Sequence, residues 1–253
     1  MIRFARPLAF AAALALSAAV PAAAQDFSAA QRGQIEKIIK DYLIKHPEVL
    51  QEAMAELEKK QAVAESEKAR SAIKNNAEAI FNSPRQVTLG NPQGDVTFVE
   101  FFDYNCGYCK RALNDMMELM AKDPKLKVVL KEFPVLGPTS VETAQVAIAV
   151  RMQDKTGKKY LEFHQKLLTG RGQIDKAKAL AAAKEIGLDM ARIEKDLKSD
   201  EIGKTLEESM KLAEALGLNG TPSYVIGNDV VIGAVGLAQL SQKIQAARQQ
   251  VVR

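Results

Sequence analysis

Residues 96–109 read VTFVEFFDYNCGYC, and the prediction of the fold starts from them. Residues 96–102 are rich in β-branched and aromatic side chains, which predicts a strand that stops at the polar run 103–105. Residues 111–120 then repeat apolar side chains at helical spacing. The two cysteines, Cys106 and Cys109, are therefore expected between a strand and a helix.

Cys106 and Cys109 are the only cysteines among the 253 residues. A helix N-terminus brings unpaired N–H groups and the positive end of the helix dipole close to Cys106, and both favour a thiolate. Disulfide exchange needs a sulfur that attacks well and leaves well, and a thiolate does both. We therefore predict that the pair is redox-active.

A structural disulfide and a metal site are the alternatives for this pair. A disulfide that closes so short a loop restricts the unfolded chain little. A structural zinc site takes four ligands, and the only histidines are His46 and His164, at scattered positions where we expect structural roles. Copper stays open because thiolates bind Cu(I), and Met116, Met117 and Met120 could add thioether ligands, although helical methionines are more often core residues.

Residues 1–24 predict a secretory signal peptide. Arg3 and Arg6 precede an apolar stretch at 8–20, and small residues follow at 22–24. The alternative, a membrane anchor, requires a longer apolar span. Export to the periplasm would place the cysteines in an oxidising compartment. The formal charge of +4 falls to about +2 without the two arginines, and nothing in it indicates nucleic-acid binding.

Residues 25–83 predict a helical extension and linker. Its apolar residues form one stripe on each of two helices, the second of which starts at Pro47. The stripe consists of Ile35, Ile38, Ile39, Tyr42, Leu43, Leu50, Met54 and Leu57. Such a stripe must be buried, so we expect it to join copies of the chain in a homo-oligomer; docking on the chain's own main domain is the alternative. The weaker pattern at 58–70 predicts a solvated helical linker that is able to bend.

Residues 84–253 predict an α/β domain. A second strand is expected at 126–133, several helices at about 138–217, and a hairpin at 223–232 with its turn at 227–229, followed by a closing helix. A parallel pair of strands joined by a helix can share one sheet with an antiparallel hairpin. The expected result is a layered domain with helices on the sheet.

This order resembles the thioredoxin fold with a helical insertion, as in the DsbA-like family of exported thiol-disulfide oxidoreductases. The resemblance covers about residues 84–251 and rests on VEFFDY at 99–104, KEFP at 131–134 and GTPSYVIG at 220–227. The signal peptide and helical extension resemble the suppressor-of-copper-sensitivity C (ScsC-like) subgroup. Members of that subgroup are often oligomeric through the extension, which favours a trimer here.

The resemblance implies roles for individual residues. Cys106 would be the exposed attacking thiolate and Cys109 the more buried resolving thiol. Pro222 would follow a cis peptide bond, which exposes the backbone of Thr221 to an extended client segment. Gly107 and Tyr108, between the cysteines, would line the same client site.

Glu100 lies six residues before Cys106, where family members often have a buried acid. A buried carboxyl group has a raised pKa and could move protons for the resolving thiol. The alternative is a strand-end carboxylate paired with a lysine.

Departures from the family pattern favour one direction of exchange. The dipeptide Gly107-Tyr108 lacks the proline and histidine of the strongly oxidising members, so no imidazole stabilises the Cys106 thiolate. Together with Thr221, it is more typical of the disulfide isomerases. We therefore expect an isomerase or reductase that acts on misoxidised exported proteins, needs no cofactor beyond its redox-active disulfide, and is kept reduced by a membrane thiol reductase of the DsbD type. A DsbA-type dithiol oxidase, a copper-tolerance protein with Cu(I) on Cys106 and Cys109, and an oligomeric holdase are the alternatives.

Overall fold

The computed structural model describes residues 27–251, so the predicted signal peptide lies outside the described residues. The chain divides into two compact units, the first ending at Glu58 and the second beginning at Lys59. No helix within residues 27–251 combines the length and the apolar character needed to cross a membrane.

The first unit contains α1 (Ala29–Lys45) and the start of α2 (Glu48–Asn75). Ser28 begins α1 with a capping box: its hydroxyl accepts a hydrogen bond from the N–H of Gln31, and the Gln31 side chain accepts one from the N–H of Ser28. The predicted apolar stripe of α1 is exposed in the single chain, as shown by Ile38 and Ile39.

The second unit contains the C-terminal part of α2 and the whole of α3 (Ala77–Phe81). Ile73 and Ile80 are buried there together with Val99 and Phe101 of the sheet. The second unit therefore begins well before residue 84, where the sequence predicts the domain boundary, because these two isoleucines are part of its core. The region 58–70, predicted as a linker able to bend, lies within α2 without a helix break.

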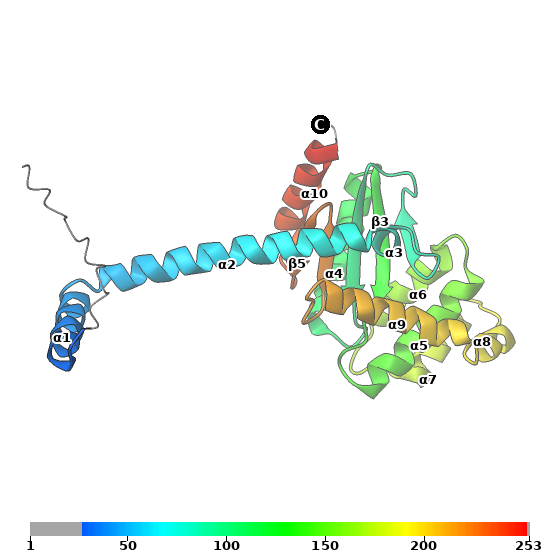
Figure 1. The fold of residues 1–253 in the computed structure, drawn as a ribbon. Helices are drawn as coiled ribbons and strands as arrows, with labels where there is room; N and C mark the ends of the chain where they lie inside the picture. The colour runs from blue at the N-terminus through cyan, green and yellow to red at the C-terminus, as the bar shows by residue number, and fades with distance from the viewer. Residues whose placement is uncertain (1–26, 252–253) are drawn as a thin grey trace, which may run out of the picture. The chain divides into compact units, whose positions relative to one another are not determined.

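The second unit is built on a five-stranded sheet in the order β1-β3-β2-β4-β5. Figure 1 shows this sheet, with β3 and β5 labelled. The strands are β1 (Val87–Gly90), β2 (Val96–Phe102), β3 (Leu126–Glu132), β4 (Ser223–Ile226) and β5 (Asp229–Ile232). β2 and β3 are parallel and are joined by α4 (Gly107–Lys122), whereas all other pairs are antiparallel. This topology confirms the predicted α/β fold with a central parallel pair and a C-terminal hairpin.

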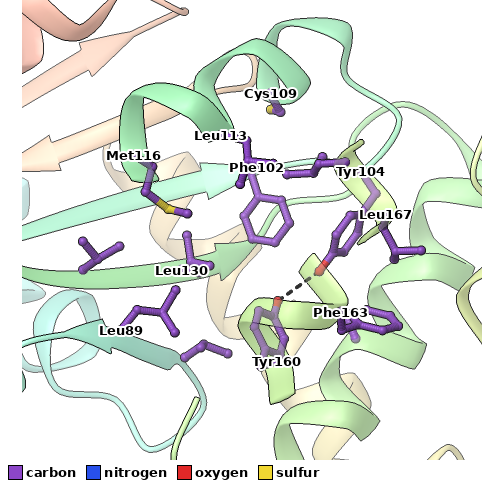
Figure 2. Close-up of a cluster of buried hydrophobic side chains, with 14 of the residues drawn as sticks. Leu89, Phe102, Tyr104, Cys109, Leu113, Met116, Leu130, Tyr160, Phe163 and Leu167 are labelled. Atoms are coloured by element: carbon purple, nitrogen blue, oxygen red, sulfur yellow. Dashed lines mark hydrogen bonds between the residues drawn. The ribbon is translucent and has the colours of Figure 1, made fainter. Parts of the chain in front are cut away.

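The helices after β3 are α5 (Pro138–Gln153), α6 (Lys158–Leu168), α7 (Lys176–Glu185), α8 (Met190–Asp196), α9 (Asp200–Ala215) and, after the hairpin, α10 (Leu237–Val251). Side chains alternate along each strand, so they point to the two faces of the sheet in turn. Helices cover both faces. Phe98 and Phe102 of β2 face one core with α4, α6 and α10, and Val99 and Phe101 face the other with α3 and α9. Figure 2 shows the first core, in which Leu113 and Met116 of α4 pack with Phe102.

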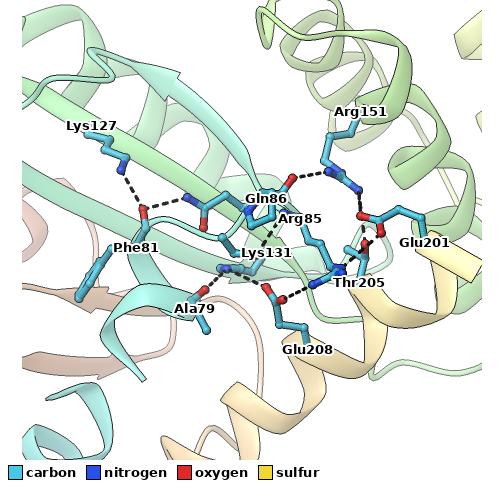
Figure 3. Close-up of polar contacts among 12 residues, drawn as sticks. Ala79, Phe81, Arg85, Gln86, Lys127, Lys131, Arg151, Glu201, Thr205 and Glu208 are labelled. Carbon is cyan, nitrogen blue, oxygen red and sulfur yellow. Dashed lines mark hydrogen bonds and ion pairs between the residues drawn. The ribbon is translucent and has the colours of Figure 1, made fainter. Parts of the chain in front are cut away.

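A polar network fastens α3 to the sheet and to α9 (Figure 3). Lys131 of β3 is buried, donates to the carbonyl of Ala79, and lies 3.7 Å from a carboxylate oxygen of Glu208. Arg85 bridges Glu208 and Glu201 of α9 at 3.2 and 3.3 Å. Two carbonyls at the end of α3 thus receive lysine donors, since Lys127 also binds the carbonyl of Phe81 at 2.8 Å.

Candidate active site at the end of β2

The turn after β2 places the cysteines at the start of α4. The N–H of Cys106 donates to the carbonyl of Asp103 at 3.1 Å, and Cys106 itself is the N-cap of α4 with extended backbone angles. Cys109 lies one turn further along the helix, so that both sulfurs lie near the helix N-terminus. The local arrangement is the one that the strand and helix patterns predict.

The two sulfurs differ in access to solvent, but neither side chain is exposed. Cys106 is 6% exposed and Cys109 is 0% exposed. The expectation of an exposed Cys106 is therefore wrong in degree, because the segment before β4 covers it: Cys106 Sγ donates to the carbonyl of Thr221 at 3.1 Å. Cys106 remains the more accessible of the two.

Thr221 and Pro222 reach the cysteines from the neighbouring strand. The peptide bond between them is cis. β4 begins directly afterwards and pairs with β2, with Ser223 opposite Phe101. This antiparallel register brings the segment before β4 next to the C-terminal end of β2.

Hydrogen bonds to sulfur shift the pKa values of the two thiols in opposite directions. The pKa of Cys106 is lowered to about 5, chiefly by a hydrogen bond from the Cys109 thiol, despite the opposing effect of burial. The Thr221 side chain and the N–H groups of Cys109 and Tyr108 contribute to the same lowering. The carbonyl of Thr221 opposes this, because it accepts only from the protonated thiol. At neutral pH Cys106 is thus a thiolate.

Cys109 has the opposite character. Its hydrogen bond to the Cys106 sulfur raises its pKa far above the ordinary value of a thiol, and burial and the nearby Glu100 raise it further. Cys109 therefore stays protonated until a base removes its proton.

Glu100 lies beneath the cysteines as a buried carboxyl group. Burial raises the pKa of Glu100 to about 8, with smaller contributions from the charges of Asp115 and Cys106. No lysine or arginine within residues 27–251 forms an ion pair with it, so the predicted alternative of a lysine partner does not describe this carboxyl. Its neighbour across the sheet is Tyr224, a buried residue whose hydroxyl lacks a hydrogen-bond partner within the described protein.

The residues between the cysteines face solvent. The Tyr108 ring is 59% exposed, and the guanidinium of Arg111 lies 4.4 Å from its centroid. Space is open around Gly107, where a Cβ would meet no atom within 4 Å. Gly107 and Tyr108 are thus both exposed to solvent.

The candidate metal ligands on α4 have another role. Met116 is fully buried in the core, and Met117 and Met120 pack against it. Within residues 27–251 no cluster of three or more histidine, cysteine, aspartate or glutamate side chains could hold a metal ion. In the part of the chain that the structure describes, the three methionines are therefore core side chains or pack against the core.

Both histidines lie outside the reactive centre. The ring of His46 lies 4.7 Å from that of Tyr42, tilted by 38°, and its Nδ1 lies 3.0 Å from a carboxylate oxygen of Glu48. His164 is buried edge-on against Phe102, and burial lowers its pKa to about 3, so it is neutral. His164 Nδ1 lies 3.3 Å from the Tyr104 hydroxyl, which donates to Tyr160 at 3.3 Å (Figure 2).

The sequence patterns do not predict the role of Asp103. Its carboxylate is buried and accepts hydrogen bonds from the N–H of Asn105 and the hydroxyl of Ser140, both at 2.8 Å. It also accepts from the N–H groups of Val135 and Leu136. An aspartate directly after a strand resembles any turn residue, and only the contacts with distant segments distinguish it.

Comparisons with known proteins agree with this geometry. The DSBA-like thioredoxin domain matches residues 97–245, and the N-terminal domain of the copper resistance protein ScsC matches residues 31–64. A thioredoxin-like oxidoreductase from Silicibacter pomeroyi is 41% identical, with a TM-score of 0.65 over 69% of this chain and 98% of that one. A linker-deleted variant of Proteus mirabilis ScsC is 27% identical, with a TM-score of 0.67 over 90% of this chain and 100% of that one.

The curated relatives include longer proteins of another name. A Na⁺/H⁺ antiporter NhaA 1 of Salinispora arenicola is 26% identical over 165 residues, which are 64% of this chain and 25% of the antiporter. The chain thus spans about a quarter of the length of the curated antiporter that it matches.

Proposed function

The chain belongs to the DSBA-like thioredoxin domain family, and from this membership we propose that it is a thiol-disulfide oxidoreductase that reshuffles or reduces disulfides in exported proteins. The observation that carries the proposal is the opposite titration of two neighbouring thiols, with Cys106 a thiolate and Cys109 a protonated thiol at neutral pH. The Cys106 sulfur can attack a disulfide, while the Cys109 sulfur reacts only in the second step of the exchange.

In the first step the Cys106 thiolate attacks one sulfur of a client disulfide. The bond between Cys106 and that sulfur forms, the client's S–S bond breaks, and the other client sulfur leaves as a thiolate. In isomerisation the released thiolate attacks another client disulfide, and a client thiolate finally displaces Cys106, so there is no net oxidation.

In reduction Cys109 completes the reaction. Its proton passes to the Glu100 carboxylate, and its thiolate attacks the Cys106 sulfur. The bond between Cys106 and the client breaks, and the client sulfur that was bound to Cys106 leaves as a thiolate that takes up a proton. The client gains two electrons and the cysteine pair becomes a disulfide. Because the pKa of Glu100 is about 8, both its acid and base forms are present near neutral pH, as proton transfer needs.

Refolding of scrambled ribonuclease tests the activity. The reduced mature protein should restore ribonuclease activity, and Cys106→Ala should abolish the effect. Client protection that persists without both cysteines would instead favour a holdase. The matched control is Cys109→Ala, which keeps the attacking thiolate and should retain part of the isomerase activity while losing the reductase activity.

A DsbA-type oxidase is the second candidate, and the low pKa of Cys106 favours it. A stabilised thiolate stabilises the reduced protein and so makes its disulfide more oxidising. Hydrogen bonds here achieve this without the histidine of the strongly oxidising members. Trapping the cellular thiols with an alkylating reagent separates the two: an isomerase is found reduced and an oxidase is found as the disulfide.

Copper tolerance is the third candidate. The solved Proteus mirabilis relative is named ScsC, and the matching N-terminal domain is described as that of a copper resistance protein. Two thiolates are soft donors suited to Cu(I), but Cys109 is fully buried. Competition with a Cu(I) chelator tests this, and tight binding without isomerase activity would support the metal module.

We also propose periplasmic location, self-association and reduction by a membrane thiol reductase of the DsbD type. Support for location comes from residues 1–24, and mass measurement of the exported protein should locate cleavage before Gln25. Support for association comes from the exposed apolar stripe of the N-terminal helices. A trimer of the chain is the proposed form.

A further inference from the structure

The loop between α6 and α7, residues 169–175, lies against the cysteine turn. Asn105, which directly precedes Cys106, accepts a hydrogen bond from the N–H of Ile174 at 2.7 Å and donates to the carbonyl of Ile174 at 2.9 Å. Ile174 is buried, so these bonds are shielded from water. A segment 69 residues later in the chain is thus fixed beside the cysteine turn.

Two lysines bind the backbone of the same loop. Lys110 of α4 donates to the carbonyls of Gly170 and Gly172 at 3.0 and 3.3 Å. Lys178 of α7 donates to the carbonyl of Gln173 at 2.6 Å. Because a carbonyl carries no net charge, these bonds hold the two ammonium groups in place without neutralising them.

Two arginines add positive charge at the same place. The guanidinium of Arg111 on α4 lies 4.4 Å from the centroid of the exposed Tyr108 ring. Arg171 lies in the middle of the fixed loop and is exposed. The ion pairs of arginine in the described part of the chain involve other residues, namely Arg85, Arg151, Arg192 and Arg248.

Positive charge exceeds negative charge in the two joined segments, residues 103–111 and 169–178. Their two carboxylates are both engaged: Asp103 is buried and accepts hydrogen bonds, and Asp175 caps α7 by accepting the N–H of Lys178. The same segments contain five basic side chains, which are Lys110, Arg111, Arg171, Lys176 and Lys178. Basic side chains thus outnumber acidic ones by five to two.

We use the name basic rim for four residues fixed beside the cysteine turn, which are Lys110, Arg111, Arg171 and Lys178. Resting on the proposed function, we propose that the basic rim recognises polypeptides with carboxylate side chains next to the disulfide to be exchanged. The attacking sulfur is a thiolate, so it repels an acidic partner. Fixed cations beside it offset this repulsion and attract the partner from a distance. The rim forms no bond to sulfur and changes only the rate of approach to Cys106.

The test uses the reduced full mature chain and three peptides of equal length with one disulfide each. Glutamates flank the disulfide in the first peptide, lysines in the second and serines in the third. Each rate is divided by that of 2-mercaptoethanol with the same peptide, so that only the contribution of the protein remains. The variant is Arg111→Glu with Arg171→Glu, which reverses two charges and keeps the lysine bonds to the loop.

The control is Lys198→Glu with Lys204→Glu, which changes the net charge of the chain by the same amount. Both lysines are exposed, in α9 and just before it, and α9 and α4 cover opposite faces of the sheet. A second variant, Arg111→Gln with Arg171→Gln, removes the two charges without introducing new ones.

In about 20 mM salt the wild type should react about tenfold faster with the acidic peptide than with the basic one. This preference should shrink in about 0.5 M salt, where charges are screened. The glutamate variant should lose or reverse the preference, the glutamine variant should weaken it, and the lysine control should keep it. Rates on the serine peptide should stay within about threefold, which also reports that each variant folds.

Equal wild-type rates on the three peptides would overturn the basic rim while leaving disulfide exchange intact. An equal loss of preference in the arginine variants and in the lysine control would also overturn it, because the net charge of the chain would then be the cause. A wild type inactive on all three peptides would overturn both proposals.

Discussion

At the residue scale, Cys106 and Cys109 titrate apart because of what surrounds each sulfur. Cys106 receives N–H groups at the start of α4 together with the Cys109 thiol, whereas Cys109 is buried beside the Glu100 carboxyl. The thiolate arises without an imidazole in the dipeptide between the cysteines. The absence of that histidine therefore does not by itself predict an unreactive sulfur.

Removing the Cys109 donor should raise the pKa of Cys106. In reduced Cys109→Ala the thiolate transition, followed by absorbance at 240 nm, should move up from about pH 5 by at least one unit. Cys109→Ser is the matched control, because its hydroxyl can still donate and should hold the transition low. Identical transitions in both variants would show that the helix N-terminus alone sets this pKa.

The second residue-scale prediction concerns Glu100, whose carboxyl binds a proton more tightly when folded. Its folded pKa of about 8 lies above the ordinary value of 4.5, so its contribution to stability is fully present below pH 4.5 and is lost as the pH rises through 8. Glu100→Gln removes that loss. The variant should gain about 2–4 kcal/mol of unfolding free energy relative to wild type between pH 4 and pH 9.

Urea unfolding at pH 4 and pH 9 measures this difference. Glu118→Gln, which removes an exposed carboxylate from α4, is the control and should follow the wild type at both values. Glu100→Gln should also slow reduction by Cys109 while leaving the first attack by Cys106 unchanged. A Glu100→Gln variant with wild-type pH dependence would mean that the carboxyl ionises freely in the folded protein.

At the element scale, α3 belongs to the second unit because both apolar and polar contacts hold it there. Ile80 is fully buried under the sheet, and Lys131 of β3 reaches the carbonyl of Ala79 (Figure 3). A buried lysine keeps its charge only with such partners, and burial still lowers the pKa of Lys131 to about 8. Lys131 therefore links β3 to α3.

Lys131→Met should therefore loosen α3. We expect a loss of about 1–3 kcal/mol of unfolding free energy and faster amide exchange over residues 76–83, since the Ala79 carbonyl loses its donor. Lys122→Met, which breaks an exposed pair with Glu118, should change stability by less than about 0.5 kcal/mol. Equal exchange rates in the two variants would count against the network as the fastening of α3.

At the scale of the whole molecule, the N-terminal unit carries an apolar stripe that the single chain leaves exposed. Deleting residues 25–82 is unsuitable for testing its role, because the cut would remove Ile73 and Ile80 from the second core. Point substitutions on α1 avoid this problem. The stripe and the opposite face of the same helix provide matched positions.

Ile38→Asp combined with Tyr42→Asp should dissociate the proposed oligomer. Light scattering should give the mass of one chain for this variant and of several chains for the wild type, because two charges would be buried in the interface. Lys37→Asp, on the opposite face of α1, should keep the wild-type mass. A wild type of single-chain mass would refute self-association and weaken the argument for isomerase activity.

Local patterns alone predict most of the elements. The apolar run 96–102, the helical spacing at 111–120 and the turn at 227–229 depend on neighbouring residues, and the strands and helices form there. The position of Cys106 at the N-cap of α4 follows from the same local pattern. The domain boundary does not follow from local patterns. Ile73 and Ile80 lie in a weak helical pattern, and their burial depends on strands that come later in the sequence.

The sequence was enough to predict the α/β fold class and a cysteine pair between a strand and a helix, because the strands and helices follow local patterns. Only the tertiary structure decided how reactive and how accessible Cys106 is. The cover over Cys106 comes from Thr221, and the loop beside it is fixed by Asp103 through Val135 and Leu136. These contacts join segments far apart in sequence, and the shifted pKa values depend on the burial that such contacts create.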